Sequence, residues 1–169
     1  MIEPLFHVSD KPAIRCFEPR PSEAVGASVV WAIAADRLHN YLLPRDCPRV
    51  TCIATPATDP ARLRDLLGGH TALVAIERAW RSRVESAALW LYELPAAPFK
   101  LHDPIAGYHI ARDSVEPLGV RPITDCPAEL AARDARLLPV ETLWPLHDEI
   151  PRLTHIFSMI RMGNAAPSR

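Results

Sequence analysis

Prolines divide this chain into short segments. Its 169 residues include 18 prolines, which are distributed along the chain rather than gathered in one stretch. Because proline fixes its own φ and lacks a backbone N–H, regular elements tend to end near it. The sequence has no proline-rich cluster that would indicate a linker, and it has no internal repeat. We therefore expect a single domain over residues 1–169.

Short patterned segments predict a mixed fold. Runs of branched and aromatic residues bounded by turn formers predict strands at 4–9, 28–33, 50–54, 72–76, 88–94, 108–111 and near 119–123. Apolar positions at helical spacing predict helices at 35–43, 59–67 and 77–86, and a further helix opened by Asp125. Thr58 or Asp59 is the expected N-cap of the second helix. The predicted class is α+β, with two small, mostly antiparallel sheets and flanking helices.

The carboxyl-terminal run also shows helical spacing. The apolar positions are Leu143, Leu146, Ile150, Leu153, Phe157 and Ile160. They predict a helix within 142–162 that covers the core and has a kink at Pro151. Trp144 and Arg161 are the residues of this run that we expect to reach a cleft.

Composition excludes a membrane-spanning protein. Hydrophobic residues make up 49% of the chain and charged residues 23%, which is typical of a globular protein. No apolar run approaches the roughly 18 residues of a membrane span. The amino terminus, MIEPLFHVSDKP, lacks the basic and long apolar regions of a secretory signal, which predicts a cytoplasmic location.

The charge pattern does not indicate a nucleic-acid partner. The formal net charge is −1, and the basic residues are scattered rather than clustered. Of the 19 basic residues only Lys11 and Lys100 are lysine. Guanidinium groups suit bidentate contact with phosphate or carboxylate, although genome base composition explains the same bias.

Cysteine and histidine spacings predict neither a disulfide framework nor a metal site. The four cysteines form no C-x-x-C pair, so we expect them to be reduced and most of them to be buried as small hydrophobes. The candidate metal ligands are scattered and lack the i, i+4 spacing of a zinc helix. They are His39, His102, Asp103, His109 and His147.

The first predicted strand carries a polar pair. In Phe6-His7-Val8-Ser9, side chains alternate between the two faces of the strand. His7 and Ser9 are therefore expected to face a cleft or solvent, whereas Phe6 and Val8 face the core. A histidine hydrogen-bonded at a strand edge is the alternative interpretation.

Two prolines flank a charged loop. Pro44 and Pro48 restrict the backbone of Arg45-Asp46-Cys47, which predicts a stiff rim between a helix and a strand. Asp46 would orient Arg45, and the guanidiniums of Arg45 and Arg49 would meet a phosphate. Alternatively, Asp46 caps the turn and both arginines are solvated. Cys47 is expected to pack inward as an unreactive thiol.

The order of these segments resembles the ADP-ribosyltransferase-like fold, nearest its short rifamycin-modifying branch. The matching pieces are FHVS, VVWAIAADRLHNYL, WLYELPAAPF and GYHIARDSVEPLGV. The chain also resembles an uncharacterised bacterial family with the pieces FHVSD, NYLLPRDCPRV, LWPL and FSMIRM. The first resemblance implies NAD as cofactor, a small-molecule nucleotide as partner and transfer at the ribose to an unknown acceptor.

The resemblance also implies site residues. In that branch a first-strand histidine and a nearby hydroxyl hold the NAD ribose and nicotinamide, an aromatic residue stacks on nicotinamide, and arginines take the phosphates. The predicted catalytic residues are His7 and Tyr41, from this resemblance, and Arg45, from the proline-flanked loop. The implied cofactor-binding residues are Ser9, Arg20, Trp31, Asn40, Tyr108 and Arg112.

One departure leaves two functions open. Transferases that modify arginine usually carry a catalytic glutamate in a [QE]-x-E motif, and this chain has no glutamine and no E-x-E. An enzyme without that glutamate would rely on positioning and electrostatic stabilisation of an oxocarbenium-like transition state. The alternative is a noncatalytic ligand-binding or interaction module of the same fold.

Overall fold

The computed structural model describes residues 3–55 and 60–168, and its backbone contacts divide the chain into two compact units. Unit 1 comprises Met1–Leu38 and Ala88–Ile123, and unit 2 comprises His39–Ala87 and Thr124–Arg169. Each unit contains its own sheet. The N-cap predicted at Thr58 or Asp59 lies outside the described residues.

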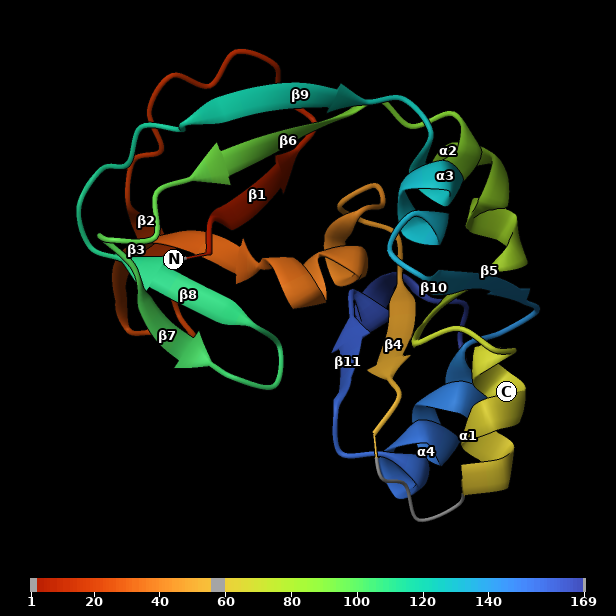
Figure 1. Ribbon diagram of the computed structural model, residues 1–169. Coiled ribbons are helices and arrows are strands. Elements are labelled where there is room, and N and C mark those ends of the chain that lie inside the picture. The colour runs from red at the N-terminus through yellow and green to blue at the C-terminus, as the bar shows by residue number, and fades with distance from the viewer. Residues whose placement is uncertain (1–2, 56–59, 169) are drawn as a thin grey trace. The chain divides into compact units, whose positions relative to one another are not determined.

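Unit 1 is built on a seven-stranded antiparallel sheet (Figure 1). Its strands are β1 (Leu5–Ser9), β2 (Arg20–Ser22), β3 (Ala27–Ala34), β6 (Leu89–Leu94), β7 (Lys100–Asp103), β8 (Tyr108–Ala111) and β9 (Gly119–Ile123). The strand order is β7-β8-β3-β1-β6-β9, with β2 paired to β3. The five strands predicted in this part of the sequence are confirmed, whereas β2 and β7 were not predicted.

The core of unit 1 covers one face of this sheet. Leu5, Val30, Tyr92 and Leu94 are buried there, and Phe17 packs over them from the loop after β1. The hydroxyl of Tyr92 donates to the carbonyl of Lys11 (2.6 Å) and accepts from the amide of Ile14 (3.1 Å). This buried tyrosine therefore fixes the loop over the sheet, because its hydroxyl satisfies two backbone groups of the loop.

Unit 2 places helices on both faces of a four-stranded sheet (Figure 1). The strands are β4 (Arg49–Ile53), β5 (Ala72–Glu77), β10 (Ala135–Val140) and β11 (Phe157–Ile160), in the order β10-β5-β4-β11. β10 pairs with β5 in parallel and the other two pairings are antiparallel. The helices are α1 (Pro60–Leu67), α2 (Arg81–Glu85), α3 (Cys126–Ala131) and α4 (Trp144–Leu153).

The two helical layers of unit 2 follow from the strand pattern. β5 is buried along its whole length, as expected for a strand covered on both faces. α1 and α4 pack on the face that carries Val50, Cys52 and Leu73. α3 begins at Asp125, whose side chain accepts from the amide of Ala128 (2.9 Å), so the helix start predicted there is confirmed.

Three helical predictions are corrected. The helix expected at 35–43 is a 3-10 helix, η1 (Ala35–Tyr41), and the one at 77–86 divides into η2 (Arg78–Trp80) and α2. The helix expected within 142–162 ends at Leu153, because Thr154 has an extended backbone (φ −149°, ψ 156°). The chain then pairs with β4 as strand β11 and ends in η3 (Met162–Asn164).

The predicted class is confirmed at the coarser level. The described residues form an α+β structure with two sheets, and β10–β5 is the parallel pairing among those sheets. The first sheet is larger than expected because the edge strands β2 and β7 add to it.

Candidate functional site

The residues predicted to form a site are distributed over both units. His7, Ser9, Arg20, Trp31, Tyr108 and Arg112 belong to unit 1, and Asn40, Tyr41 and Arg45 belong to unit 2.

The face predicted for His7 and Ser9 is wrong. His7 lies directly opposite Tyr92 in the β1–β6 pairing, and Leu5 lies opposite Leu94. Residues opposite each other in an antiparallel pair share a face. His7 and Ser9 therefore lie on the face that carries the buried cluster, not on a separate polar face.

Local contacts engage both polar side chains. Nδ1 of His7 is 3.0 Å from the carbonyl oxygen of Trp31, and the imidazole lies 4.8 Å from the ring of Phe17. β1 pairs with β3 only through Leu5 and Phe6, so this imidazole meets a β3 carbonyl just beyond the last paired residues. Ser9 Oγ accepts from the amide of Lys11 (3.1 Å). These contacts match the alternative interpretation of a hydrogen-bonded histidine beside a strand.

An aromatic cluster lies on the opposite face of the same sheet. The Trp31 ring is 5.1 Å from the Tyr108 ring and 5.4 Å from the His102 ring, both in edge-to-face geometry. Trp31 and Tyr108 are partly exposed and His102 is exposed. We call these three residues the aromatic face. His7 and Tyr108 therefore project from opposite faces of the sheet.

The aromatic face results from strand register and a bulge. Tyr108 pairs with Ile33, which shares a face with Trp31 two residues earlier on β3. His102 is two residues after Lys100, which lies opposite Ile110 on the same face, and the β7–β8 register shifts between Leu101 and Asp103 around it. From sequence, His102 was only a candidate metal ligand, because the strand β7 that places its ring beside Trp31 was not predicted.

An arginine shares this face. Arg20 of β2 lies opposite Val29 in the β2–β3 pairing, and Val29 lies on the same side of β3 as Trp31. Diagonal neighbours on one face are about 7–8 Å apart, which is within reach of a long side chain. Arg20 is exposed, and so is Arg112, which directly follows β8. The register thus places Arg20 on the face that carries Trp31.

The proline-flanked loop of unit 2 is organised by Arg49. This guanidinium is buried, with 2% relative exposure, and donates to four carbonyls over 2.9–3.1 Å. The acceptors are the carbonyls of Cys47, Asn40, Pro44 and Arg45. Both roles considered for Arg49, phosphate contact and solvation, are therefore wrong, because its donors hold the loop from inside.

Arg45 and Cys47 point in opposite directions. Arg45 is exposed, as expected of a rim residue, whereas the thiol of Cys47 is fully buried. Burial raises the pKa of Cys47 to about 11, so the thiolate is disfavoured at neutral pH. The prediction that this thiol packs inward is confirmed.

Asn40 and Tyr41 end the η1 helix. Tyr41 is partly exposed, and the side chain of Asn40 is buried. Oδ1 of Asn40 has no hydrogen-bond partner among the described residues, although the backbone carbonyl of Asn40 accepts from Arg49 (3.1 Å).

Within residues 3–55 and 60–168, no group of three or more His, Cys, Asp and Glu side chains has the arrangement to hold a metal ion. No helix in those ranges is long and apolar enough to cross a membrane.

The described residues thus define an α+β protein with a partly exposed aromatic face and an adjacent arginine. The chain belongs to the DUF6886 family, a family of unknown function whose profile matches residues 6–165. All the predicted site residues fall within that range. Comparisons with curated proteins and with solved structures find no match.

Proposed function

We propose that this chain binds NAD or a related nucleotide on the aromatic face of unit 1. The observation that carries the proposal is that the rings of Tyr108 and His102 lie 5.1 and 5.4 Å from the partly exposed ring of Trp31. A planar base or nicotinamide ring stacks on such aromatic side chains, and each stacked base contributes about 1–3 kcal/mol.

Arg20 supplies the charge complement. Arg20 lies on the same face as Trp31, at a diagonal position on the neighbouring strand, so a nucleotide whose ring contacts the indole would bring its phosphates toward an arginine. Guanidinium–phosphate pairs form two parallel charge-assisted hydrogen bonds, which add geometric specificity. Arg20 and the aromatic face together favour a phosphorylated planar ligand over a neutral one.

Noncatalytic binding is the form of this proposal that the geometry supports best. His7, expected to be catalytic, has its Nδ1 against the Trp31 carbonyl and lies on the other face of the sheet. A transferase reaction at the ribose, with its acceptor unknown, would need a catalytic group on the same face as the bound ring.

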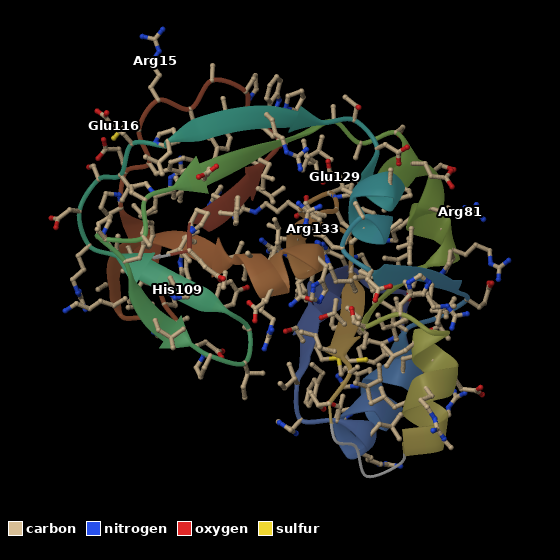
Figure 2. The ribbon with its side chains drawn as sticks, viewed as in Figure 1. Arg15, Arg81, His109, Glu116, Glu129 and Arg133 are labelled. Carbon is tan, nitrogen blue, oxygen red and sulfur yellow. The ribbon has the colours of Figure 1, made fainter. Side chains whose placement is uncertain are left out.

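Calorimetric titration with NAD, ADP-ribose and nicotinamide tests the proposal. Trp31→Leu should lower the affinity for NAD by about 5-fold to 150-fold, the range that corresponds to one stacked ring. Arg20→Ala should weaken the binding of NAD and ADP-ribose but leave the binding of nicotinamide unchanged. Arg15→Ala is the matched control, because Arg15 is an exposed arginine of unit 1 that extends away from the ribbon (Figure 2).

Two outcomes would contradict the proposal. One is the absence of heat with all three ligands at millimolar concentration. The other is equal loss of NAD binding in Trp31→Leu and Trp80→Leu, since Trp80 belongs to unit 2. Release of nicotinamide from NAD, followed in the same samples, separates binding from the transferase reaction, and we expect none.

A further inference from the structure

The segment 161–168 crosses one end of the sheet in unit 2. The indole Nε1 of Trp144 donates to the carbonyl of Ala166, and the amide of Ala166 donates to both carboxylate oxygens of Glu77 (3.1 and 3.0 Å). The side-chain amide of Asn164 donates to the carbonyl of Asp46 (2.8 Å). We call residues 161–168 the strap, and Glu77 with Trp144 the clamp.

The clamp recognises backbone rather than a side chain. Its carboxylate takes the N–H of Ala166 and its indole takes the C=O of the same residue, so both polar groups of one residue are held. The backbone before it is extended, with φ −69° and ψ 155° at Ala165. A carboxylate acceptor and an indole donor at this spacing fit one residue of an extended peptide.

The clamp lies where a sheet of this kind binds ligands. β10 is parallel to β5, and β11 runs in the same direction because each of β11 and β5 is antiparallel to β4. The carboxyl ends of these three strands therefore lie at one edge of the sheet, and Glu77 is the last residue of β5. Crevices outside the carboxyl ends of strands are the common ligand sites of sheets covered by helices on both faces.

Glu77 has no role in the proposed nucleotide site, yet its carboxylate is buried, with 3% relative exposure. A buried carboxylate needs hydrogen-bond donors, and the strap supplies one through the amide of Ala166. The strap itself is mostly exposed, with Ala166 at the surface. The clamp is thus a preformed acceptor and donor pair occupied by an exposed segment of the same chain.

A strained residue connects the strap to the sheet. Arg161, which follows β11, has φ +54° and ψ 32°, a left-handed conformation that a residue with a side chain adopts at a cost. The turn at Arg161 directs the chain back toward the clamp of its own copy. An extended conformation at Arg161 would relieve the strain and carry the strap away from that clamp.

We propose that the strap is exchanged between two copies of this chain, so that the clamp of each copy holds the Ala166 backbone of the other. The second copy is the occupant that fits, because its strap makes the same contacts with Glu77, Trp144 and Asp46 that the chain makes with itself. Exchange of an identical segment forms dimers without new interactions, and a strained hinge favours it. This inference is independent of the nucleotide site in unit 1.

The matched variants Arg161→Val and Arg161→Gly test the hinge in the full chain. Valine is β-branched and resists positive φ, whereas glycine adopts it freely. Light scattering after size exclusion should show the dimer of Arg161→Val at concentrations at least 10-fold lower than for the unsubstituted chain. Arg161→Gly should require concentrations several-fold higher.

The clamp variant decides whether the dimer uses this site. Adding Glu77→Ala to Arg161→Val removes the acceptor, and the double variant should remain monomeric at the concentrations where Arg161→Val is a dimer. Dimerisation that is unchanged by Glu77→Ala, or equal in Arg161→Val and Arg161→Gly, would overturn the proposal.

A second measurement applies if Arg161→Val does not fold. Donor-labelled and acceptor-labelled samples of the otherwise unsubstituted chain, each carrying Ser168→Cys, are mixed at rising concentration. Energy transfer that develops with concentration, and that Trp144→Phe reduces, is the expected result. Absence of transfer up to millimolar concentration would refute exchange.

Discussion

At the scale of single residues, the two arginines that flank Cys47 show what sequence can and cannot predict. Both were expected to meet a phosphate, Arg45 from a stiff loop whose backbone is fixed by prolines on either side. Only Arg45 is exposed, while Arg49 is buried as the first residue of β4. A guanidinium with several donors can satisfy carbonyls that a folded loop turns inward, and no local pattern specifies which arginine does so.

Replacing Arg49 should therefore affect stability rather than binding. Arg49→Met leaves buried carbonyls without a donor, and each unsatisfied group costs about 1–3 kcal/mol. We expect the free energy of unfolding to fall by roughly 2–4 kcal/mol, whereas Arg45→Ala should change it by about 0.5 kcal/mol or less. Urea denaturation followed by circular dichroism measures both. Equal effects of the two substitutions would contradict the role assigned to Arg49.

Three buried thiols predict a loss of stability in alkali. Burial raises the pKa of Cys47 to about 11, of Cys52 to about 12 and of Cys126 to about 11, from an ordinary value of 9.0. Because the folded pKa values exceed the unfolded ones, this stabilisation is fully present below about pH 9 and is lost as pH rises toward the folded values.

Urea denaturation under reducing conditions between pH 7 and pH 11 measures this loss. Each thiol contributes a slope of up to about 1.4 kcal/mol per pH unit. Cys47→Ala should reduce the slope above pH 9 by the share of one thiol. A free energy of unfolding that stays constant from pH 8 to pH 10.5 would show that the thiols ionise without unfolding.

At the scale of elements, segments with a strong local pattern were predicted and segments defined by distant partners were not. The strand 72–76 is a continuous run of buried residues, and the structure extends it by only one residue. β11 was read as helix because Phe157 and Ile160 continue the apolar spacing of α4. Its strand conformation comes from pairing with β4, which lies about a hundred residues earlier in the chain.

The β7–β8 turn allows a test of an element that positions the aromatic face. Gly107 has φ +72°, and a Cβ there would lie 2.5 Å from Cγ of Arg37. Gly26 has φ +66°, with no atom within 4 Å of the corresponding position. Gly26→Ala should cost about 1–2 kcal/mol from backbone strain alone, and Gly107→Ala should cost about 1–3 kcal/mol more from overpacking.

Thermal or urea unfolding distinguishes these two glycines. If Gly107→Ala and Gly26→Ala lower the free energy of unfolding equally, the close approach of Arg37 does not constrain the β7–β8 turn. If the aromatic face depends on this turn, Gly107→Ala should also weaken NAD binding, while Gly26→Ala should not.

At the scale of the whole molecule, the pattern of short segments predicted the class and left the site open. The α+β class with mostly antiparallel sheets followed from alternating short segments. The alternation of side chains also correctly placed His7 and Phe6 on opposite faces of the strand, but it did not specify which face would be buried. The face depends on the loop that Tyr92 and Phe17 hold over the sheet, and that packing joins segments about 80 residues apart.

Nucleotide binding at the aromatic face can be followed through the indole N–H resonances of the tryptophans. The chain has four tryptophans, Trp31, Trp80, Trp90 and Trp144, and each indole N–H gives its own signal in a ¹H–¹⁵N spectrum. During titration with NAD, the Trp31 signal should shift progressively and saturate, whereas those of Trp80 and Trp144 in unit 2 stay in place. Saturable shifts confined to Trp80 or Trp144, or no shift at millimolar NAD, would contradict the account.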